Sequence, residues 1–284
     1  MSAGRVFTTD FAVRYDECDA AGWLRPSVYL CYTQEAATRD ARDAGWGPHP
    51  WVIRRSRLFV HQAVGYAERL AVKTWGRGLG RSTAQRAYEF SDEHGRLVAE
   101  AHSLWVYLDE TTLRPSRLPA DFNEIWFPGR EPLAPSDLPD WPANPATAPY
   151  SSTASIGYSL LDGQQHLNNA RYLDLLDDAT WAILSAQGLE LEQVSSQGGL
   201  LATSYDVEYL NTACLGDELT VNSWLSSTSV NYLDRQQEIR RGEQLVARSH
   251  SNWRWVNPLG EARAVPETVL RALAAAPLPL TPTA

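Results

Sequence analysis

Cysteine and methionine are scarce in this chain, and long apolar runs are absent. The 284 residues contain one methionine and three cysteines, Cys18, Cys31 and Cys214. The cysteines are odd in number, widely spaced and without a C-x-x-C pair, so they indicate neither a disulfide framework nor a zinc site. No apolar run approaches the roughly 18 residues that a membrane helix needs. We therefore expect no membrane span, no bound metal and no cofactor.

Positive charge is also in deficit. Lys and Arg number 25 against 34 Asp and Glu, which gives a formal net charge of −9. This balance argues against nucleic acid as the main partner, because no basic excess exists to neutralise phosphates. The first residues, Met1 to Asp19, hold no long apolar core of the kind that a signal peptide needs, so we expect a cytoplasmic protein. Hydrophobic residues, at 44%, are sufficient for a sizeable core.

An internal repeat organises the whole sequence. Three segments of the first half have counterparts in the second half, in the same order and at nearly constant spacing. The pairs are Asp19 to Tyr29 with Asp162 to Tyr172, Glu68 to Trp75 with Asp217 to Trp224, and Leu97 to Trp105 with Leu245 to Trp253. A periodic match of this kind indicates a duplicated structural unit. We therefore expect two copies of one fold.

Each copy predicts one long helix and an antiparallel sheet, which makes the fold class α+β. Helices are expected over Pro26 to Ala44 and Asn169 to Gln187, because Pro26 suits a first helical position and Gly45 and Gly188 mark the ends. One strand precedes each helix, and four follow it with turn signals between them. The expected strands are 7–14, 56–63, 69–76, 82–90 and 97–108, and then 153–158, 203–210, 218–225, 229–239 and 244–256.

The segment from Pro119 to Tyr150 is rich in proline and has few periodic residues, so we interpret it as an extended linker. The C-terminal segment AAAPLPLTPTA is expected to be disordered. The predicted organisation is therefore a first unit at 1–120, a linker at 121–150, a second unit at 151–275 and a tail at 276–284.

The motif with the clearest chemistry lies at the start of the second copy. Asp162, Gln164 and His166 occur at two-residue intervals before a helix that we expect to start near Asn168. An extended approach would turn the three side chains the same way. A helix N-terminus presents unpaired N–H groups and a partial positive charge, so a developing oxyanion could be held there. A polar turn that caps an ordinary helix is the alternative interpretation.

This stretch resembles the D-x-N-x-H-x-N-N segment, followed by a helical tyrosine, in the C-terminal half of acyl-carrier-protein (ACP) thioesterases. Gln164 stands where the family has asparagine. The resemblance implies two tandem hotdog domains, each a long helix wrapped by an antiparallel sheet. Because single-unit relatives dimerise, we expect an intrachain pseudo-dimer with a continuous sheet and a site at the junction. The matching residues are Asp162, His166, Asn168, Asn169 and Tyr172.

The implied activity is hydrolysis of an acyl thioester, carried by ACP or by CoA, in fatty acid biosynthesis. Asp162 would act either as general base toward water or as nucleophile, and the sequence leaves both roles open. His166 and Gln164 would orient water and substrate, and backbone N–H groups at the helix N-terminus near Asn168 would polarise the thioester carbonyl. Asn169 and Tyr172 would contact the substrate. A non-hydrolytic acyl-thioester binding protein or a hydratase relative of the same fold is the alternative function.

The first copy keeps the acid, as Asp19, but loses most of the motif. Trp23 stands at the position of His166, and Ala21 at that of Gln164. This asymmetry suits a duplicated enzyme in which one copy retains the site and the other forms a substrate-binding wall that includes Trp23. The stretch before Gly22 also partly resembles the D-C-D-P-A-G segment of 4-hydroxybenzoyl-CoA thioesterases. Asp19 is therefore a second candidate for catalysis, beside a structural role in a turn.

Plant members of the resembled family carry a further acid on a strand, at a position that corresponds to about Thr212 here. Either Asp177 or Asp178 on the helix takes that role, or the role is absent.

The densest basic region combines Arg54, Arg55 and Arg57 with Arg77 and Arg81. These side chains would contact the phosphates of phosphopantetheine or CoA, or they form a solvated strand face. The expected partner is the acyl thioester substrate. A monomer, or a homodimer of the intrachain pseudo-dimer, is the expected assembly.

Overall fold

A computed structural model describes residues 4–47, 49–129, 131–195, 198–228 and 232–274. In the first half, one long helix and five strands follow the order predicted from the repeat, and the second half repeats them. The first set is β1 (Val6–Ala12), α1 (Pro26–Asp43), β2 (Trp51–Val60), β3 (Arg69–Leu79), β4 (Thr83–Ser91) and β5 (Leu97–Tyr107). The second is β6 (Tyr150–Ser155), α3 (Arg171–Ala186), β7 (Gly199–Tyr209), β8 (Glu218–Thr228), β9 (Leu233–Arg241) and β10 (Gln244–Val256).

Shorter elements complete the chain. A single 3-10 turn precedes each long helix, and three short helices and one short strand lie elsewhere in the chain. They are η1 (Tyr15–Glu17), η2 (Tyr158–Leu160), α2 (Ala120–Trp126), α4 (Leu191–Ser195), β11 (Ala262–Arg263) and α5 (Glu267–Ala274). The predicted tail at 276–284 lies outside the described residues. None of the described helices combines the length and apolarity that a membrane crossing requires.

Both predicted long helices are confirmed. Helix α1 begins at Pro26 after an extended Arg25, and Gly45 follows its end with a φ of 69°. Helix α3 is followed by Gly188 with a φ of 77°. Glycine tolerates this left-handed conformation because it has no Cβ, which explains how both helices stop where they do.

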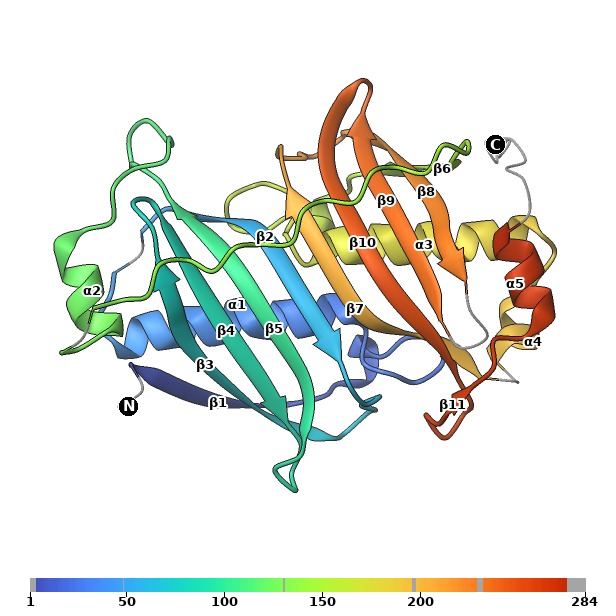
Figure 1. Cartoon of the computed structure of the whole chain (residues 1–284), viewed down its shortest axis with the longest axis horizontal. Helices are drawn as coiled ribbons and strands as arrows, with labels where there is room; N and C mark the ends of the chain where they lie inside the picture. Colours follow the sequence, from blue (N-terminus) through green and yellow to red (C-terminus); the bar gives the residue numbers. More distant parts are fainter. Residues whose placement is uncertain (1–3, 48, 130, 196–197, 229–231, 275–284) are drawn as a thin grey trace.

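One antiparallel sheet runs through the whole molecule in the order β1-β3-β4-β5-β2-β7-β10-β9-β8-β6. At the centre of the sheet, β2 of the first half pairs with β7 of the second, from Arg55 opposite Glu208 to Phe59 opposite Ser204. On each side of this pair, the strands of one half follow in equivalent order, β5-β4-β3-β1 on one side and β10-β9-β8-β6 on the other. Figure 1 shows the two half-sheets side by side with α1 and α3 behind them. The predicted α+β fold, two tandem hotdog units joined as a pseudo-dimer, is confirmed.

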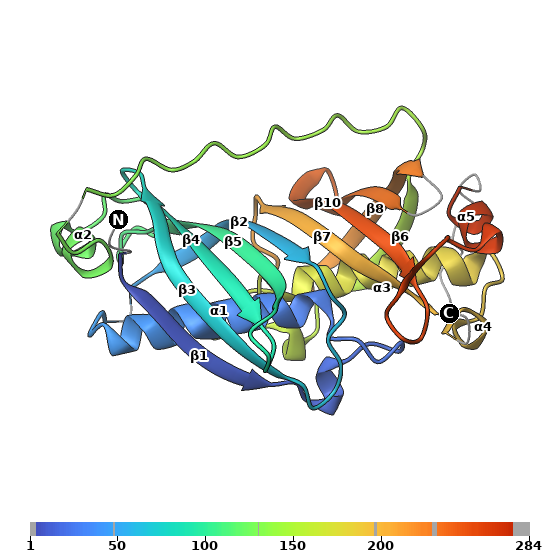
Figure 2. The same cartoon turned by 60° about the horizontal axis from the view of Figure 1, so that its bottom comes forward.

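The linker crosses the sheet on the face opposite the two long helices (Figures 1 and 2). Trp141 lies between the halves, with its ring centroid 5.2 Å from the Arg55 guanidinium carbon and 4.5 Å from that of Arg248. Contacts of this kind are attractive because a cation meets the negative face of the ring. The linker therefore connects the outer faces of the two half-sheets.

The prediction of a fully extended linker is wrong at its start, where α2 forms. Phe122 and Trp126, four residues apart on one helix face, are buried against Trp46 in a small second core. Burial of this aromatic face stabilises a helix that the surrounding prolines do not suggest. We keep the division into units at 1–120 and 151–275 as a proposal, with α2 packed on the first unit.

Candidate active site

The loop from Asp162 to Asn168, called the Asp162 loop below, is a tight turn. The Asp162 backbone N–H donates to the His166 carbonyl over 3.0 Å, and Asp162 Oδ1 accepts from the Gln164 N–H at 2.9 Å. Gln165 has a positive φ of 64°. The expectation of an extended approach that turns three side chains the same way is therefore wrong, because the backbone folds back on itself at Gln165.

Asn168 closes the loop against the helix. Its Oδ1 accepts from the Ala170 N–H at 2.9 Å, and its carbonyl accepts from the Arg171 N–H at 2.9 Å. Helix α3 consequently begins at Arg171, and not near Asn168 as expected. The Asn168 N–H donates to the Leu160 carbonyl. The N–H groups of Asn168, Ala170 and Arg171, at the helix N-terminus that was expected to hold an oxyanion, thus already have partners.

The Asp162 loop lies on the first half of the molecule. Asn168 Nδ2 donates to Gln34 Oε1 of α1 over 3.0 Å and lies 3.5 Å from Asp162 Oδ2. Gln164 Nε2 is 3.4 Å from the Trp51 carbonyl at the start of β2. The polar residues therefore come from both halves, and sequence reasoning missed Gln34. Its position in the repeat is the available signal, because Gln34 corresponds to Asp177 on α3.

Asp162 and His166 are both partly exposed. The His166 ring makes no hydrogen bond or ion pair within the described part of the chain, and the Asp162 carboxylate contacts only the Gln164 amide and Asn168 there. The structure therefore brings Asp162, Gln164 and Asn168 together but leaves the imidazole apart from them. Both the carboxylate and the imidazole have capacity for water or substrate.

A cavity of about 300 Å³ opens beside Gln164, between α1 and the sheet of the first half. Its wall is mostly apolar and aromatic, with small residues where α1 and the strands face each other. The lining residues include Trp46, Trp51, Trp105, Phe122, Trp126 and Phe127, together with Ala37, Thr38, Ala41, Gly76, Ala84 and Arg86. A small cavity with a mostly apolar wall can hold a hydrocarbon group.

The corresponding loop of the first copy repeats the same turn. Asp19 N–H donates to the Trp23 carbonyl at 2.7 Å, and Asp19 Oδ1 accepts from the N–H groups of Ala21 and Trp23, each at 2.9 Å. Burial raises the pKa of Asp19 against the opposing effect of these hydrogen bonds. One of its carboxylate oxygens is therefore committed to holding the turn.

The Asp19 loop borders a second cavity, of about 680 Å³, on α3 and β7. Asp177 and Asp178 line this second cavity and not the one beside Gln164. Asp177 accepts a hydrogen bond from the Tyr205 hydroxyl, and its burial raises its pKa to about 8. These two acids therefore do not serve the Asp162 loop.

The predicted phosphate contacts lie on the outer face of the central strand pair. Arg55 binds Asp206 with Nε–Oδ1 at 2.6 Å and Nη2–Oδ2 at 2.7 Å, and Arg57 Nε lies 3.2 Å from the same carboxylate. Arg54 Nη2 lies 3.0 Å from Glu208 Oε1. These three cations pair with β7 and connect the halves, so a phosphate would have to compete with two carboxylates.

The other predicted substrate contacts are away from the cavity beside Gln164. Tyr172 is buried, with its ring centroid 5.3 Å from that of Tyr209, and the Tyr209 hydroxyl donates to the Asn169 carbonyl at 2.9 Å. Trp23 pairs through its backbone with Gly65. A substrate role for Asn169, Tyr172 and Trp23 stays a prediction.

Two family models match the chain. Residues 4–126 match the acyl-ACP thioesterase N-terminal domain, and residues 159–273 match the thioesterase-like superfamily. The first half of the chain is thus similar to acyl-ACP thioesterases, and the second half to the wider thioesterase-like superfamily. The two matched ranges correspond to the two copies of the repeat.

Curated relatives include two palmitoyl-acyl carrier protein thioesterases described as chloroplastic. The protein from Gossypium hirsutum is 26% identical over 234 residues, which is 74% of this chain and 57% of the relative. The protein from Arabidopsis thaliana is 26% identical over 207 residues, 66% of this chain and 50% of the relative. The chain thus spans about half the length of the curated relatives it matches.

Solved structures share the fold. A 12:0-ACP thioesterase from Umbellularia californica superposes with a TM-score of 0.72 at 20% identity, over 88% of this chain and 94% of that one. An acyl-ACP thioesterase from Bacteroides thetaiotaomicron gives a TM-score of 0.68 at 20% identity, over 87% and 97%. Both agree with the double-hotdog architecture described above.

Proposed function

We propose that the protein hydrolyses an acyl thioester at the Asp162 loop and releases a free acid and a thiol. One observation carries the proposal: a loop of the second half lies on α1 and β2 of the first half and contributes Gln164 to the wall of an aromatic cavity. The cavity would hold the acyl group, and the carboxylate of Asp162 would stand next to the thioester carbon.

Asp162 can act in either of two ways. As a general base, it takes a proton from water, whose oxygen attacks the thioester carbon; the C–S bond then breaks and the thiolate leaves. As a nucleophile, one carboxylate oxygen attacks that carbon, the C–S bond breaks and the thiolate leaves; water then hydrolyses the resulting anhydride to the free acid and the Asp162 carboxylate. A single turnover in ¹⁸O-labelled water separates the routes, because the label enters the Asp162 carboxylate only in the second, when water attacks its carbonyl carbon.

The amides around Asp162 would hold the developing oxyanion. Gln164 Nε2 has a long contact of 3.4 Å to the Trp51 carbonyl, so it can turn toward a substrate oxygen at small cost. Asn168, held by Gln34, would orient the carboxylate. The imidazole of His166, which has no hydrogen-bond partner among the described residues, would give a proton to the departing thiolate.

The carrier and the place of the reaction are part of the proposal. The names of the curated relatives favour ACP over CoA as carrier. Fatty acid biosynthesis supplies such a substrate. A cytoplasmic location is proposed on the sequence alone, as is an assembly of one or two chains.

The decisive experiment is a thiol-release assay over acyl-ACP and acyl-CoA substrates of graded length. Asp162→Asn keeps the shape of the side chain but removes its charge, so kcat should fall by about 10²–10⁴ with little change in KM. Asp19→Asn, the same change in the other copy, is the matched control and should lower kcat less than about tenfold. Melting temperatures establish that both variants are folded.

A larger loss in Asp19→Asn than in Asp162→Asn would move the active site to the first copy. Tight binding of acyl thioesters without thiol release would favour the non-hydrolytic acyl-binding function instead.

A further inference from the structure

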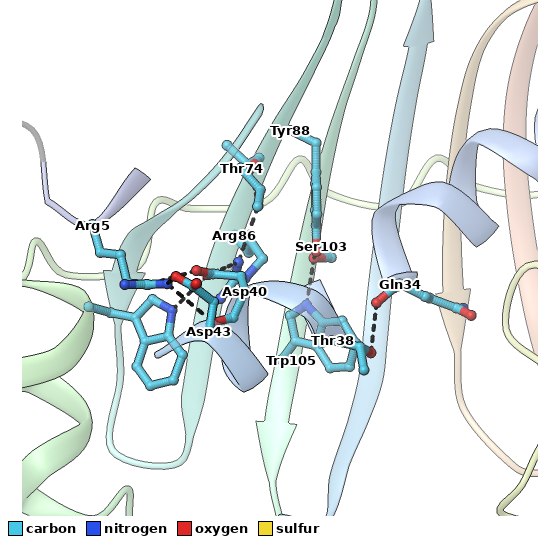
Figure 3. Close-up of polar contacts among 12 residues, drawn as sticks. Arg5, Gln34, Thr38, Asp40, Asp43, Thr74, Arg86, Tyr88, Ser103 and Trp105 are labelled. Atoms are coloured by element: carbon cyan, nitrogen blue, oxygen red, sulfur yellow. Dashed lines mark hydrogen bonds and ion pairs between the residues drawn. The ribbon is translucent and has the colours of Figure 1, made fainter. Parts of the chain in front are cut away.

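The cavity beside Gln164 contains one permanent charge among its described lining residues, the guanidinium of Arg86. The side chain of Arg86 is 11% exposed and points from β4 toward α1 (Figure 3). A cation in the wall of an apolar cavity is costly unless its donors are satisfied. The hydrogen bonds of Arg86 therefore indicate what the cavity is built to hold.

Only one nitrogen of Arg86, Nη1, donates hydrogen bonds to the described residues. Nη1 donates to Asp40 Oδ2 at 2.7 Å and to Thr74 Oγ1 at 3.3 Å. Nε and Nη2 make no hydrogen bond within the described part of the chain, although a guanidinium carries five donors. Asp40 cannot turn further toward Arg86, because Oδ1 accepts from Arg5 at 2.7 Å and Oδ2 also accepts from the Trp126 indole at 3.1 Å. Donors of Arg86 thus remain for a ligand.

The charges around Arg86 already balance. Arg5 and Arg86 face Asp40 and Asp43, with Arg5 Nη2 bound to Asp43 at 2.5 Å. A ligand carboxylate would add an unbalanced negative charge next to Asp40, which is 1% exposed. A neutral oxygen accepts the free N–H groups without this repulsion. The chemistry therefore favours a keto or hydroxyl group over a carboxylate.

Arg86 lies at the end of the cavity remote from the Asp162 loop. Gln34, which contacts Asn168, precedes Asp40 by six residues on α1, and at 1.5 Å per residue this is about 9 Å along the helix. Figure 3 shows the Arg86 and Asp40 cluster at one side, Gln34 at the other and Trp105 between them. A group that contacts Arg86 is therefore carried on the distal part of the acyl group.

We propose that the preferred acyl group carries a neutral oxygen, keto or hydroxyl, on its distal part, where Arg86 donates to it. This proposal rests on the proposed thioesterase function and names its substrate class. Arg86 would then be a specificity residue: it binds a substrate oxygen far from the reacting carbon and takes no part in the chemical step.

The test compares thioesters of one chain length that differ only in a distal keto or hydroxyl group, placed at successive carbons. In the wild type, kcat/KM should be at least about tenfold higher for the oxygenated thioester at the matching carbon, as a hydrogen bond to a charged donor suggests. In Arg86→Met this advantage should disappear, so that the kcat/KM values of the oxygenated and plain thioesters of one length agree within about threefold. Asp40 keeps Arg5 as its partner in this variant.

Arg235→Met is the matched control. Arg235 occupies the equivalent position on β9, opposite Ser251 as Arg86 is opposite Ser103, but does not line the cavity. Its loss should leave the oxygen preference unchanged. The wild-type comparison alone decides the question if Arg86→Met does not fold.

The proposal is overturned if the plain thioester is the better substrate at every position, or if the preference survives Arg86→Met. Absence of thiol release from all thioesters would instead defeat the proposed function. Calorimetry with the matched free acids then still tests the cavity: tighter binding of an oxygenated acid, lost in Arg86→Met, supports the proposal, and equal affinity contradicts it.

Discussion

The two halves have the same backbone plan but send side chains of different size into the space between helix and sheet. Four positions that line the first cavity have larger counterparts in the second half. The pairs are Thr38 and Trp181, Ala41 and Leu184, Gly76 and Leu225, and Ala84 and Leu233. Because interiors are close-packed, these exchanges decide where open volume exists. The space beside Gly76 and Ala84 in the first half is therefore open, whereas Leu225 and Leu233 occupy the equivalent space in the second half.

The two loops differ in a complementary way. The Asp162 loop belongs to the second half, carries Gln164 and His166, and lies over the cavity of the first half. The Asp19 loop has Ala21 and Trp23 at those positions and borders a cavity in which carboxyl groups outnumber guanidinium groups. Its charged lining residues are Asp19, Asp174, Asp177, Asp178 and Glu190, with Arg25 and Arg171. Such a wall repels the phosphates of CoA or of a carrier's prosthetic group. Gln164 of the Asp162 loop thus lines an aromatic cavity at one junction of the halves, whereas the Asp19 loop borders a cavity with several carboxyl groups at the other.

The two equivalent arginines show the same divergence. Arg86 pairs with Asp40, whereas Ile183 occupies the position on α3 that is equivalent to Asp40. Arg235 is 2% exposed, and its Nη1 and Nη2 have no partner in the described part of the chain. Burial lowers its pKa to about 10. The buried guanidinium of Arg86 is stabilised by an ion pair, whereas burial of the Arg235 guanidinium lowers the stability of the second half.

The strongest test of this asymmetry gives the Asp162 loop the residues of the Asp19 loop. The double variant Gln164→Ala, His166→Trp should lower kcat by about 10² or more, because it removes both an oxyanion donor and a proton donor while retaining Asp162. Thiol release measures the effect. The reverse double variant, Ala21→Gln with Trp23→His, is the control and should create no second activity, since Asp177 stands where the first half has Gln34. Full activity in the first variant would contradict the assignment of both residues.

A second test exchanges the packing residues. Ala84→Leu gives the cavity the side chain found at Leu233, so kcat/KM should fall about tenfold for the longest acyl chain that the wild type accepts and stay unchanged for short chains. The selectivity profile measures this. Leu233→Ala, the opposite change at a fully buried site, should leave the profile intact but lower the free energy of unfolding by about 2–5 kcal/mol. Equal losses at all chain lengths in Ala84→Leu would place the acyl group elsewhere.

The smallest effect concerns Asp177, whose raised pKa of about 8 sets a pH dependence. A carboxyl with a pKa above its unfolded value of about 3.9 binds its proton more tightly in the folded state, so its ionisation lowers stability as pH rises from about 4 to 8. Asp177→Asn removes this loss. Its gain in unfolding free energy should grow with pH and reach at least about 1.4 kcal/mol, one pKa unit, by pH 8.

Urea unfolding of the wild type and of Asp177→Asn at pH 4, 6 and 8 measures this trend. Glu124→Gln, the same kind of change at an exposed carboxyl group, is the control. A gain that is independent of pH would show that Asp177 does not titrate in this range.

The repeat made the fold predictable, because the matched segments recur over the whole chain. An error in the bounds of one strand therefore does not change the predicted architecture. Strand β2 shows where local reading failed: it begins at Trp51, five residues before the predicted Ser56. A bulge between Ile53 and Arg55 interrupts the alternation there. Helix α2 was missed for a similar reason, since its two buried aromatic residues lie in a proline-rich segment.

The candidate site was predicted only as far as its loop. The motif identified Asp162, but Gln34 lies 134 residues from Asn168 in sequence, and the ion pair of Arg86 with Asp40 spans 46 residues. Such pairs are set by the meeting of helix and sheet and leave no local pattern. Comparing the two copies position by position gives a partial signal, because Asp40 has the apolar Ile183 as its counterpart and the neutral Gln34 has the acidic Asp177.

The linker, whose Trp141 lies on the central strand pair, joins the two copies in one chain. This covalent connection has a genetic consequence. In a dimer of identical chains, each mutation is present twice, and a change that empties one core would empty both. Here the two copies are encoded separately, so glycine at position 76 can coexist with leucine at position 225. Covalent fusion thus allows one copy to specialise in holding a substrate while the other keeps the packed core that holds the molecule together.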